Sequence, residues 1–259
     1  SMYPREKTKM LNRFHLWWPA GIVIGSLVGL ILMDIMNLNW QLMVASLFVP
    51  LALYGYLLIG QTFPQTERVT LGVNQKDALK SLTKPLFLFI AFCMLLSAST
   101  ELGTTQRIES LLRETGVNAL LILAFINGIM IFGRAFAGPI ATKINTTGML
   151  FASSIFAFIG LQMLANTEVF NVFLAASVFA IGITFFWPTT LAYISENIPE
   201  SGALGMSIIG GLGMLSVSLI LPLMGRFLDD SISTDVIQTI SVLPFILIIL
   251  YGILYLKQR

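Results

Sequence analysis

The chain has 259 residues, of which 56% are hydrophobic and only 11% charged, and its formal net charge is +2. A soluble globular domain carries about 25% charged residues, so this chain could not cover its surface with polar groups in water. The small net charge argues against a nucleic-acid partner, and the single cysteine, Cys93, excludes an internal disulfide.

Eight apolar runs follow one another along the chain. A hydrocarbon core about 30 Å thick needs about 20 apolar residues in a helix. Backbone polar groups in lipid must be satisfied within their own segment, so each run is expected to be helical. We therefore predict an all-α, polytopic transmembrane bundle with spans at 17–36, 40–61, 85–104, 117–138, 147–165, 170–194, 203–225 and 236–256.

Lysine and arginine gather on alternate connections. Twelve of the 15 lie on the side of the N-terminus, where the longest polar loop, 62–84, is also placed; Arg107, Arg113 and Arg226 lie on the other side. Positive charge marks the cytoplasmic side of a membrane protein. We expect a multi-pass protein of the cell inner membrane, with an even number of spans and both termini cytoplasmic.

Three glycines repeat every four residues in the first predicted span, at Gly21, Gly25 and Gly29. Small residues at this spacing form a smooth ridge that lets helices approach closely in lipid. We interpret the ridge as a packing surface, and a sliding surface is the alternative.

Prolines inside the predicted spans leave carbonyl groups without a helical partner. A proline has no backbone N–H, so the carbonyl four residues earlier is free. In lipid such a carbonyl needs a neighbouring donor or water. The prolines are Pro50, Pro188, Pro222 and Pro244, and the carbonyls belong to Ser46, Thr184, Ser218 and Ile240.

A carboxylate lies deep in the third predicted span. At about 1.5 Å per residue, Glu101 lies about 24 Å along the helix from Pro85. Polar groups inside a membrane usually face a cavity or a partner. Glu101 is therefore a candidate for solute contact or for proton coupling. The alternative is an interfacial glutamate that is wetted from outside and paired with Arg107.

Further polar and aromatic side chains fall within the fourth and sixth predicted spans. Asn127 lies about 15 Å into its run, and Trp187, Thr189 and Tyr193 cluster around Pro188. Aromatic rings beside hydroxyls and amides suit a small polar solute such as a sugar. Hydrogen bonds between helices and an interfacial aromatic belt would explain the same residues.

Motifs of catalysis are missing from the sequence. There is no His-Glu-x-x-His pair, no Gly-x-Ser-x-Gly elbow and no phosphate-binding glycine loop, and His15 is the only histidine. We predict that the protein is not an enzyme and needs no metal and no cofactor.

The segment 132–143, with Gly133, Arg134, Gly138 and Lys143, resembles the major facilitator superfamily, which carries a Gly-Arg…Gly…basic element at the cytoplasmic end of a helix. The segments 17–21, 63–68 and 101–106 are similar to its bacterial sugar-permease-like members. The resemblance implies twelve helices in two six-helix halves, of which this chain matches the last eight. Residues 1–61 would be the last two helices of the N-terminal bundle, 62–84 the central cytoplasmic loop and 85–259 the C-terminal bundle. The missing N-terminal helices of the same protein would be its partners.

The resemblance also implies a secondary active transporter, such as a symporter, that works by alternating access. The third, fourth, sixth and seventh runs would face the cavity. Gly133, Arg134, Gly138 and Lys143 would belong to the cytoplasmic gate, or Arg134 and Lys143 would simply snorkel to the interface. The element lacks the acidic residue of the complete family motif. The alternative function is a non-transporting fragment, sensor or assembly partner that keeps the fold.

Overall fold

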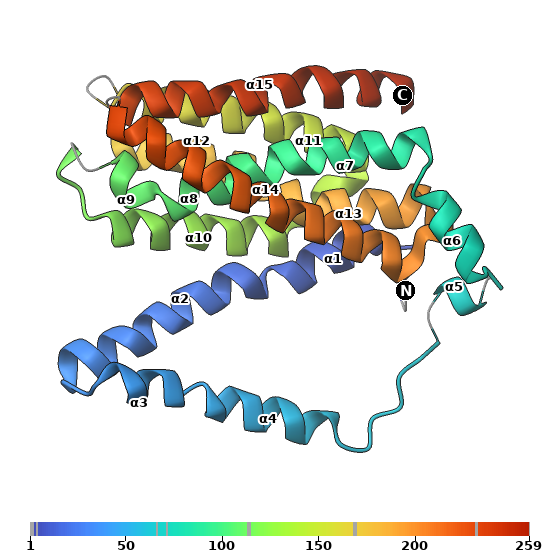
Figure 1. Ribbon diagram of the computed structural model, residues 1–259, viewed down its shortest axis with the longest axis horizontal. Coiled ribbons are helices and arrows are strands. Elements are labelled where there is room, and N and C mark those ends of the chain that lie inside the picture. The colour runs from blue at the N-terminus through green and yellow to red at the C-terminus, as the bar shows by residue number, and fades with distance from the viewer. Residues whose placement is uncertain are drawn as a thin grey trace.

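The computed structural model describes residue 3 and residues 5–65, 67–70, 72–112, 115–167, 170–230 and 233–258. Regular structure within these ranges is helical throughout, as predicted (Figure 1). The first part holds α1 (Lys7–His15), α2 (Trp17–Gly29), the π-helix η1 (Leu30–Ile35), α3 (Trp40–Ala45), α4 (Phe48–Leu58), α5 (Glu67–Thr70) and α6 (Gln75–Ser81). The remainder holds α7 (Pro85–Ala98), the π-helix η2 (Ser99–Gly103), α8 (Thr104–Gln106), α9 (Ile108–Leu111), α10 (Ala119–Ala135), α11 (Ala137–Leu164), α12 (Val172–Ile183), α13 (Phe186–Asn197), η4 (Pro199–Ser201), α14 (Gly202–Asp230) and α15 (Ser233–Gln258).

The helices follow the predicted spans closely. Among the described residues, seven helical segments are long and apolar enough to cross a membrane, and Leu121–Ala135 of α10 is a shorter apolar segment. Both chain ends lie at the same end of the bundle (Figure 1), as an even number of spans requires. The Lys84–Glu200 ion pair holds the end of the 62–84 loop against η4 at this same end.

The fourth span extends beyond its predicted end at residue 138. Three contacts join this part of the chain to α12 and α13, and in each of them the partner lies about 50 residues later in the sequence. They are the Phe125–Phe173 ring pair, the Arg134–Thr184 hydrogen bond and the Thr146–Glu196 hydrogen bond. Residues 119–144 therefore run alongside residues 173–196 as one span, made of two helical segments with a break at Phe136.

The chain turns back at Asn145. Its φ is +53° and its ψ is 176°, a backbone conformation that residues other than glycine rarely adopt, and its side-chain oxygen accepts a hydrogen bond from the Gly148 N–H at 2.8 Å. The fifth span then returns antiparallel to α15, which the Gln162–Ser241 hydrogen bond joins to α11. The prediction that the fourth span ends near Gly138 is wrong, and Arg134 lies inside the span.

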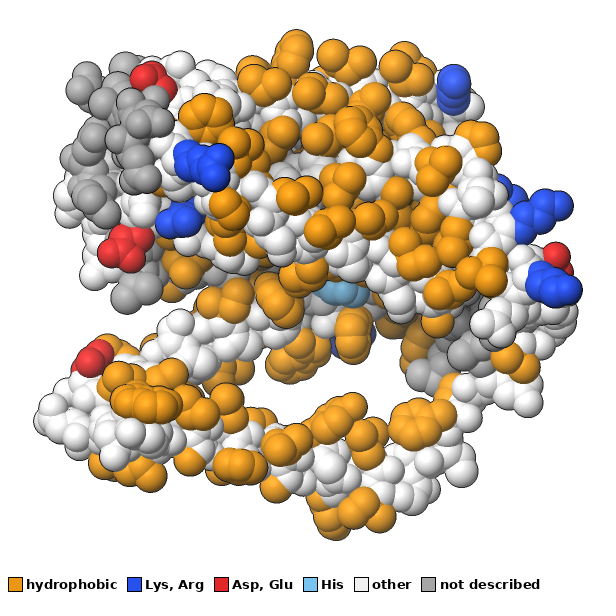
Figure 2. Space-filling model, in the orientation of Figure 1, with side chains coloured by type: hydrophobic (Ala, Val, Ile, Leu, Met, Phe, Trp, Pro, Cys, Tyr) orange, Lys and Arg blue, Asp and Glu red, His pale blue; other side chains and the backbone are white. Residues whose placement is uncertain are grey.

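An arm formed by the outer part of α2 and by α3 and α4 stands away from the other helices (Figure 1). The segment Trp40–Leu58 is apolar, yet none of its most hydrophobic stretch is buried. Groups of hydrophobic side chains lie along the visible face of the arm (Figure 2). A Cβ added at Gly21 or Gly25 would meet nothing within 4 Å, so this part of the predicted glycine ridge packs against no described residue.

Helices α11 and α12 approach each other very closely. A Cβ on Gly160 would overlap the backbone of Phe179, and one on Gly182 would overlap the backbone of Ala157. Two helices can approach this closely only where both lack side chains at the crossing. This crossing fixes α12, and with it the position of the Thr184 carbonyl.

Candidate functional site

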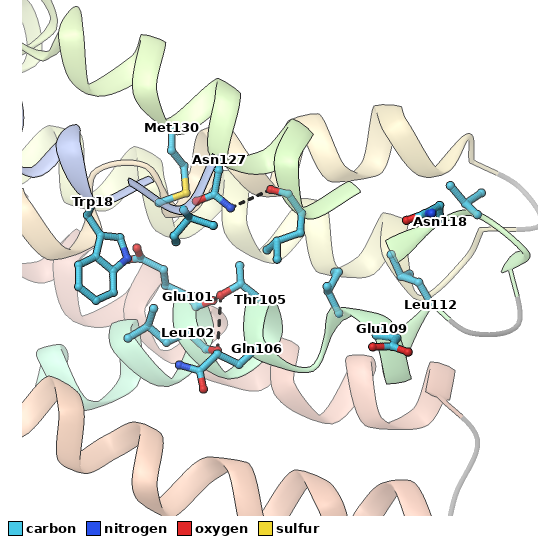
Figure 3. A pocket seen from close by; sticks show the side chains of 14 residues that line it. Trp18, Glu101, Leu102, Thr105, Gln106, Glu109, Leu112, Asn118, Asn127 and Met130 are labelled. Atoms are coloured by element: carbon cyan, nitrogen blue, oxygen red, sulfur yellow. Dashed lines mark hydrogen bonds between the residues drawn. The ribbon is translucent and has the colours of Figure 1, made fainter. Parts of the chain in front are cut away.

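A cavity of about 750 Å³ lies between α2, α10 and the segment from η2 to α9. Figure 3 shows Trp18, Glu101 and Asn127 near one end of it and Glu109 and Asn118 at the other. The lining residues are Trp18, Ile22, Glu101, Leu102, Thr105, Gln106, Ile108, Glu109, Leu112, Val117, Asn118, Leu123, Asn127 and Met130. Its wall is mostly apolar, with a few polar groups at fixed positions, which is typical of a small-molecule site.

Glu101 is held in the π-helix η2 and is only 3% exposed. A π-helical turn inserts an extra residue and is frequent at functional sites, because it redirects side chains. Oε1 accepts a hydrogen bond from the Arg134 guanidinium at 3.1 Å, whereas Oε2 has no partner among the described residues. A buried acceptor without a donor is costly. Oε2 is therefore a buried acceptor that the described part of the chain leaves without a donor.

Arg134 is buried and ties three parts of the chain together. Its Nε donates to the Thr184 carbonyl at 2.8 Å, its Nη1 to the His15 carbonyl at 2.9 Å, and its Nη2 to Glu101. The Thr184 carbonyl is the one that Pro188 leaves free, so the expected donor is this arginine. Glu101 is therefore neither interfacial nor paired with Arg107, which instead donates to the Leu221 carbonyl at 3.4 Å.

The ion pair lies far from both ends of its span. Arg134 precedes the turn at Asn145 by 11 residues, which at 1.5 Å each is about 16 Å. Because Arg134 is only 2% exposed and its guanidinium makes three hydrogen bonds inside the protein, the prediction that it snorkels to the interface is wrong. An isolated charge here would be very unfavourable, and the carboxylate and the guanidinium neutralise each other.

A second hollow of about 410 Å³ shares Trp18, Glu101 and Leu102 with the first. Its remaining lining residues are Phe14, His15, Trp17, Arg134, Trp187 and Met214. Gly213 makes room for the Trp187 ring, since a Cβ there would lie 2.6 Å from a ring atom. Aromatic rings thus surround the ion pair on this side.

The family model for the Major Facilitator Superfamily matches residues 1–215, which include every residue that lines the two hollows. The chain belongs to the Major Facilitator Superfamily. It is a multi-pass membrane protein of a transporter family, which fits the prediction that it is not an enzyme. No curated protein and no solved structure matches this chain.

In this Major Facilitator chain, three of the predicted solute-binding residues come together. Glu101 and Asn127 line the larger cavity, and Trp187 lines the smaller one beside Glu101. The Asn127 amide donates to the Leu123 carbonyl of its own helix at 2.8 Å.

The other two predicted solute-binding residues lie elsewhere. Thr189 is buried and accepts a hydrogen bond from the Asn12 amide at 3.2 Å. The Tyr193 hydroxyl accepts a hydrogen bond from the side-chain amide of Gln258, next to the C-terminus. Neither residue lines the two hollows described above, so both are held in contacts between helices.

The four predicted gating residues have different surroundings. A Cβ on Gly133 would lie 2.7 Å from the Thr184 side chain, and one on Gly138 would lie 3.0 Å from the Lys9 side chain. Lys143 is exposed, two residues before the turn at Asn145. Gly133 and Gly138 therefore permit close contacts along the helix that carries Arg134, and the gating role of all four residues stays a prediction.

Sequence reasoning missed two contributors to the site. Trp18 forms a wall of both hollows, and the His15 backbone carbonyl binds Arg134. The tryptophan pair at 17–18 was visible in the sequence, whereas a backbone acceptor leaves no sequence signal. Within the described part of the chain, no group of three or more His, Cys, Asp or Glu residues could hold a metal ion.

Proposed function

We propose that the protein is a secondary active transporter that moves a small polar solute by alternating access around the Glu101–Arg134 pair. The observation that supports this most is a buried, mutually neutralised ion pair deep in the bundle, on the wall of a cavity, with one carboxylate oxygen unpartnered. Ionisable groups within spans commonly mark a solute or ion pathway. Binding near the middle of the spans is the arrangement that alternating access needs.

A sugar is the proposed solute. The tryptophan rings of Trp18 and Trp187 offer flat apolar faces, and Glu101 Oε2 offers an acceptor for a hydroxyl group. Since Glu101 and Arg134 already balance each other, a solute without net charge adds no unpaired charge to the cavity.

Glu101 is also the proposed site of proton coupling, because its free oxygen can take a proton while the other oxygen remains beside Arg134. Glu101→Gln should therefore abolish the pH dependence of uptake. The measurement is uptake of labelled mono- and disaccharides into proteoliposomes, with and without a pH gradient.

Glu109→Gln is the matched control, because Glu109 is an exposed carboxylate of the same cavity. It should keep the wild-type pH profile. An unchanged profile in Glu101→Gln would remove Glu101 from coupling. A wild-type protein that takes up none of these sugars would remove the sugar assignment, and a total lack of solute flux would favour a sensor or an assembly partner.

The proposal includes a location and partners. We place the protein in the cell inner membrane with both termini cytoplasmic, as the lysine and arginine distribution favours. Residues 1–61 would belong to an N-terminal bundle, 62–84 to the central loop and 85–259 to the C-terminal bundle. Further helices of the same protein would cover the exposed apolar arm at Trp40–Leu58.

A further inference from the structure

One wall of the larger cavity carries polar groups over its whole length. Glu101, Thr105 and Glu109 follow one another at intervals of four residues, so they lie on one face of the segment from η2 to α9. The Thr105 hydroxyl donates to the Glu101 backbone carbonyl at 2.8 Å, one turn earlier. Eight residues separate the two carboxylates, which at 1.5 Å each is about 12 Å. The cavity therefore reaches from the buried ion pair to the level of Glu109.

The facing wall, formed by α10 and the residue before it, has a similar arrangement. Asn127 lies at the end beside the ion pair, and Asn118 lies nine residues earlier, which is about 14 Å along the helix. The Asn118 side-chain oxygen accepts a hydrogen bond from the Leu121 N–H at 3.2 Å, which holds the amide group at the start of α10. Each end of the cavity thus has a carboxylate on one wall and an amide on the other (Figure 3).

The two ends of the cavity differ in their access to solvent. Glu101 and Asn127 are each only 3% exposed, whereas Gln106, Glu109 and Asn118 are exposed. These three residues therefore lie at the mouth of the cavity, at the end of the bundle away from the two termini (Figure 1). We call Gln106, Glu109 and Asn118 the outer polar group.

The length of the cavity limits which solute can fill it. Its volume of about 750 Å³ is in the upper part of the range for small-molecule sites, which is about 300–1,000 Å³. A single sugar ring beside Trp18, Glu101 and Asn127 would occupy only the inner end, and it would not reach Glu109 about 12 Å away. A solute that fills both ends must be longer than one ring and must carry hydroxyl groups at both of its ends.

We propose that the outer polar group is a second sugar-binding subsite, and that the solute is a disaccharide that lies lengthwise in the cavity. This inference rests on the proposed transport of a sugar and names the class of sugar. The inner ring lies beside Trp18, with hydroxyl groups towards Glu101 and Asn127. The outer ring donates to the Glu109 carboxylate and exchanges hydrogen bonds with the amides of the outer polar group. Because Glu109 lies far from Arg134, its substitution affects binding of the outer ring and not the pH profile of uptake.

Sugar binding to the purified full chain in detergent tests the outer subsite. The probes are maltose, cellobiose and lactose, together with glucose and galactose, and binding is measured by isothermal titration calorimetry. The wild-type protein should bind at least one disaccharide more tightly than the monosaccharides from which it is built. Glu109→Ala should weaken binding of that disaccharide about tenfold, because hydrogen bonds to a carboxylate are lost. It should leave the affinity for the monosaccharide unchanged, because a single ring occupies the inner end.

Two further variants sharpen the result. Gln106→Ala should have the same selective effect as Glu109→Ala but a smaller one, because a neutral amide makes weaker hydrogen bonds than a carboxylate. Asp235→Ala is the matched control, since Asp235 is an exposed carboxylate in the first turn of α15, at the same end of the bundle, and does not line the cavity. It should leave both affinities unchanged.

The ratio between the disaccharide and monosaccharide affinities decides the outcome, because a lower fraction of folded protein does not change it. A wild-type protein that binds no disaccharide better than its monosaccharides would overturn the outer subsite. An unchanged ratio in both Glu109→Ala and Gln106→Ala would also overturn it. If the wild-type protein binds monosaccharides alone, the proposed sugar transport stands without this inference, whereas binding of none of the five sugars would overturn both.

Discussion

Arg134→Met is expected to lower the free energy of unfolding by about 3–5 kcal/mol, because it leaves Glu101 as a buried charge without its partner. The carbonyls of Thr184 and His15 would lose their donor in the same variant. The measurement is unfolding of the purified protein in detergent, followed by circular dichroism.

The double variant Glu101→Gln/Arg134→Met should recover part of this loss, because no buried charge remains. Arg107→Met is the matched control, since Arg107 is only partly buried and makes one long hydrogen bond to a backbone carbonyl. Wild-type stability in Arg134→Met, or a double variant less stable than Arg134→Met alone, would contradict the buried ion pair.

Gly160→Ala and Gly182→Ala are each expected to destabilise the bundle by about 3 kcal/mol, at the upper end of overpacking effects. The added methyl group at either position would overlap backbone atoms of the facing helix, and backbone cannot move aside as a flexible side chain can. The cost arises at the crossing of α11 and α12. It should appear as a lower unfolding temperature and a lower yield of folded protein.

Gly128→Ala is the matched control for both variants. Gly128 lies within α10, and a Cβ there would meet nothing within 4 Å. Because alanine favours helix more than glycine does, this variant should be neutral or stabilising by up to about 1 kcal/mol. Equal behaviour of Gly160→Ala and Gly128→Ala would show that α11 and α12 do not approach as closely as described.

The spans could be predicted from the sequence because hydropathy over about 20 residues measures directly what the bilayer requires. The end of the fourth span could not be predicted in this way. Gly138 and Pro139 have the composition of a helix end, yet the break falls at Phe136 and a new helical segment starts at Ala137. Pro139 then lies in a first turn, where its missing N–H costs nothing. The reversal occurs later, at Asn145.

One member of the Glu101–Arg134 ion pair, Glu101, could be predicted from the sequence. Glu101 was singled out by its depth, and Pro188 predicted that the Thr184 carbonyl would need a donor. The identity of that donor depends on the packing of α10 against α12, which no local pattern encodes. Thr189 and Tyr193 were expected near the solute because they cluster with Trp187 around Pro188, but on a helix the positions two and six residues after Trp187 point to other sides. Of these three residues, only Trp187 lines one of the two hollows described above.

Water accessibility along α10 tests most directly whether the cavity beside Glu101 is a solute pathway. Leu123 lines the cavity and is partly exposed, whereas Phe132 on the same helix is 70% exposed on the outer surface. Each is replaced by cysteine in a Cys93→Ala background, and the intact protein in membranes is treated with a membrane-impermeant thiol reagent. Leu123→Cys should react and Phe132→Cys should not, because the first lines the cavity and the second faces an apolar environment. Reaction at Phe132→Cys alone, or at neither position, would contradict a water-filled cavity at the ion pair.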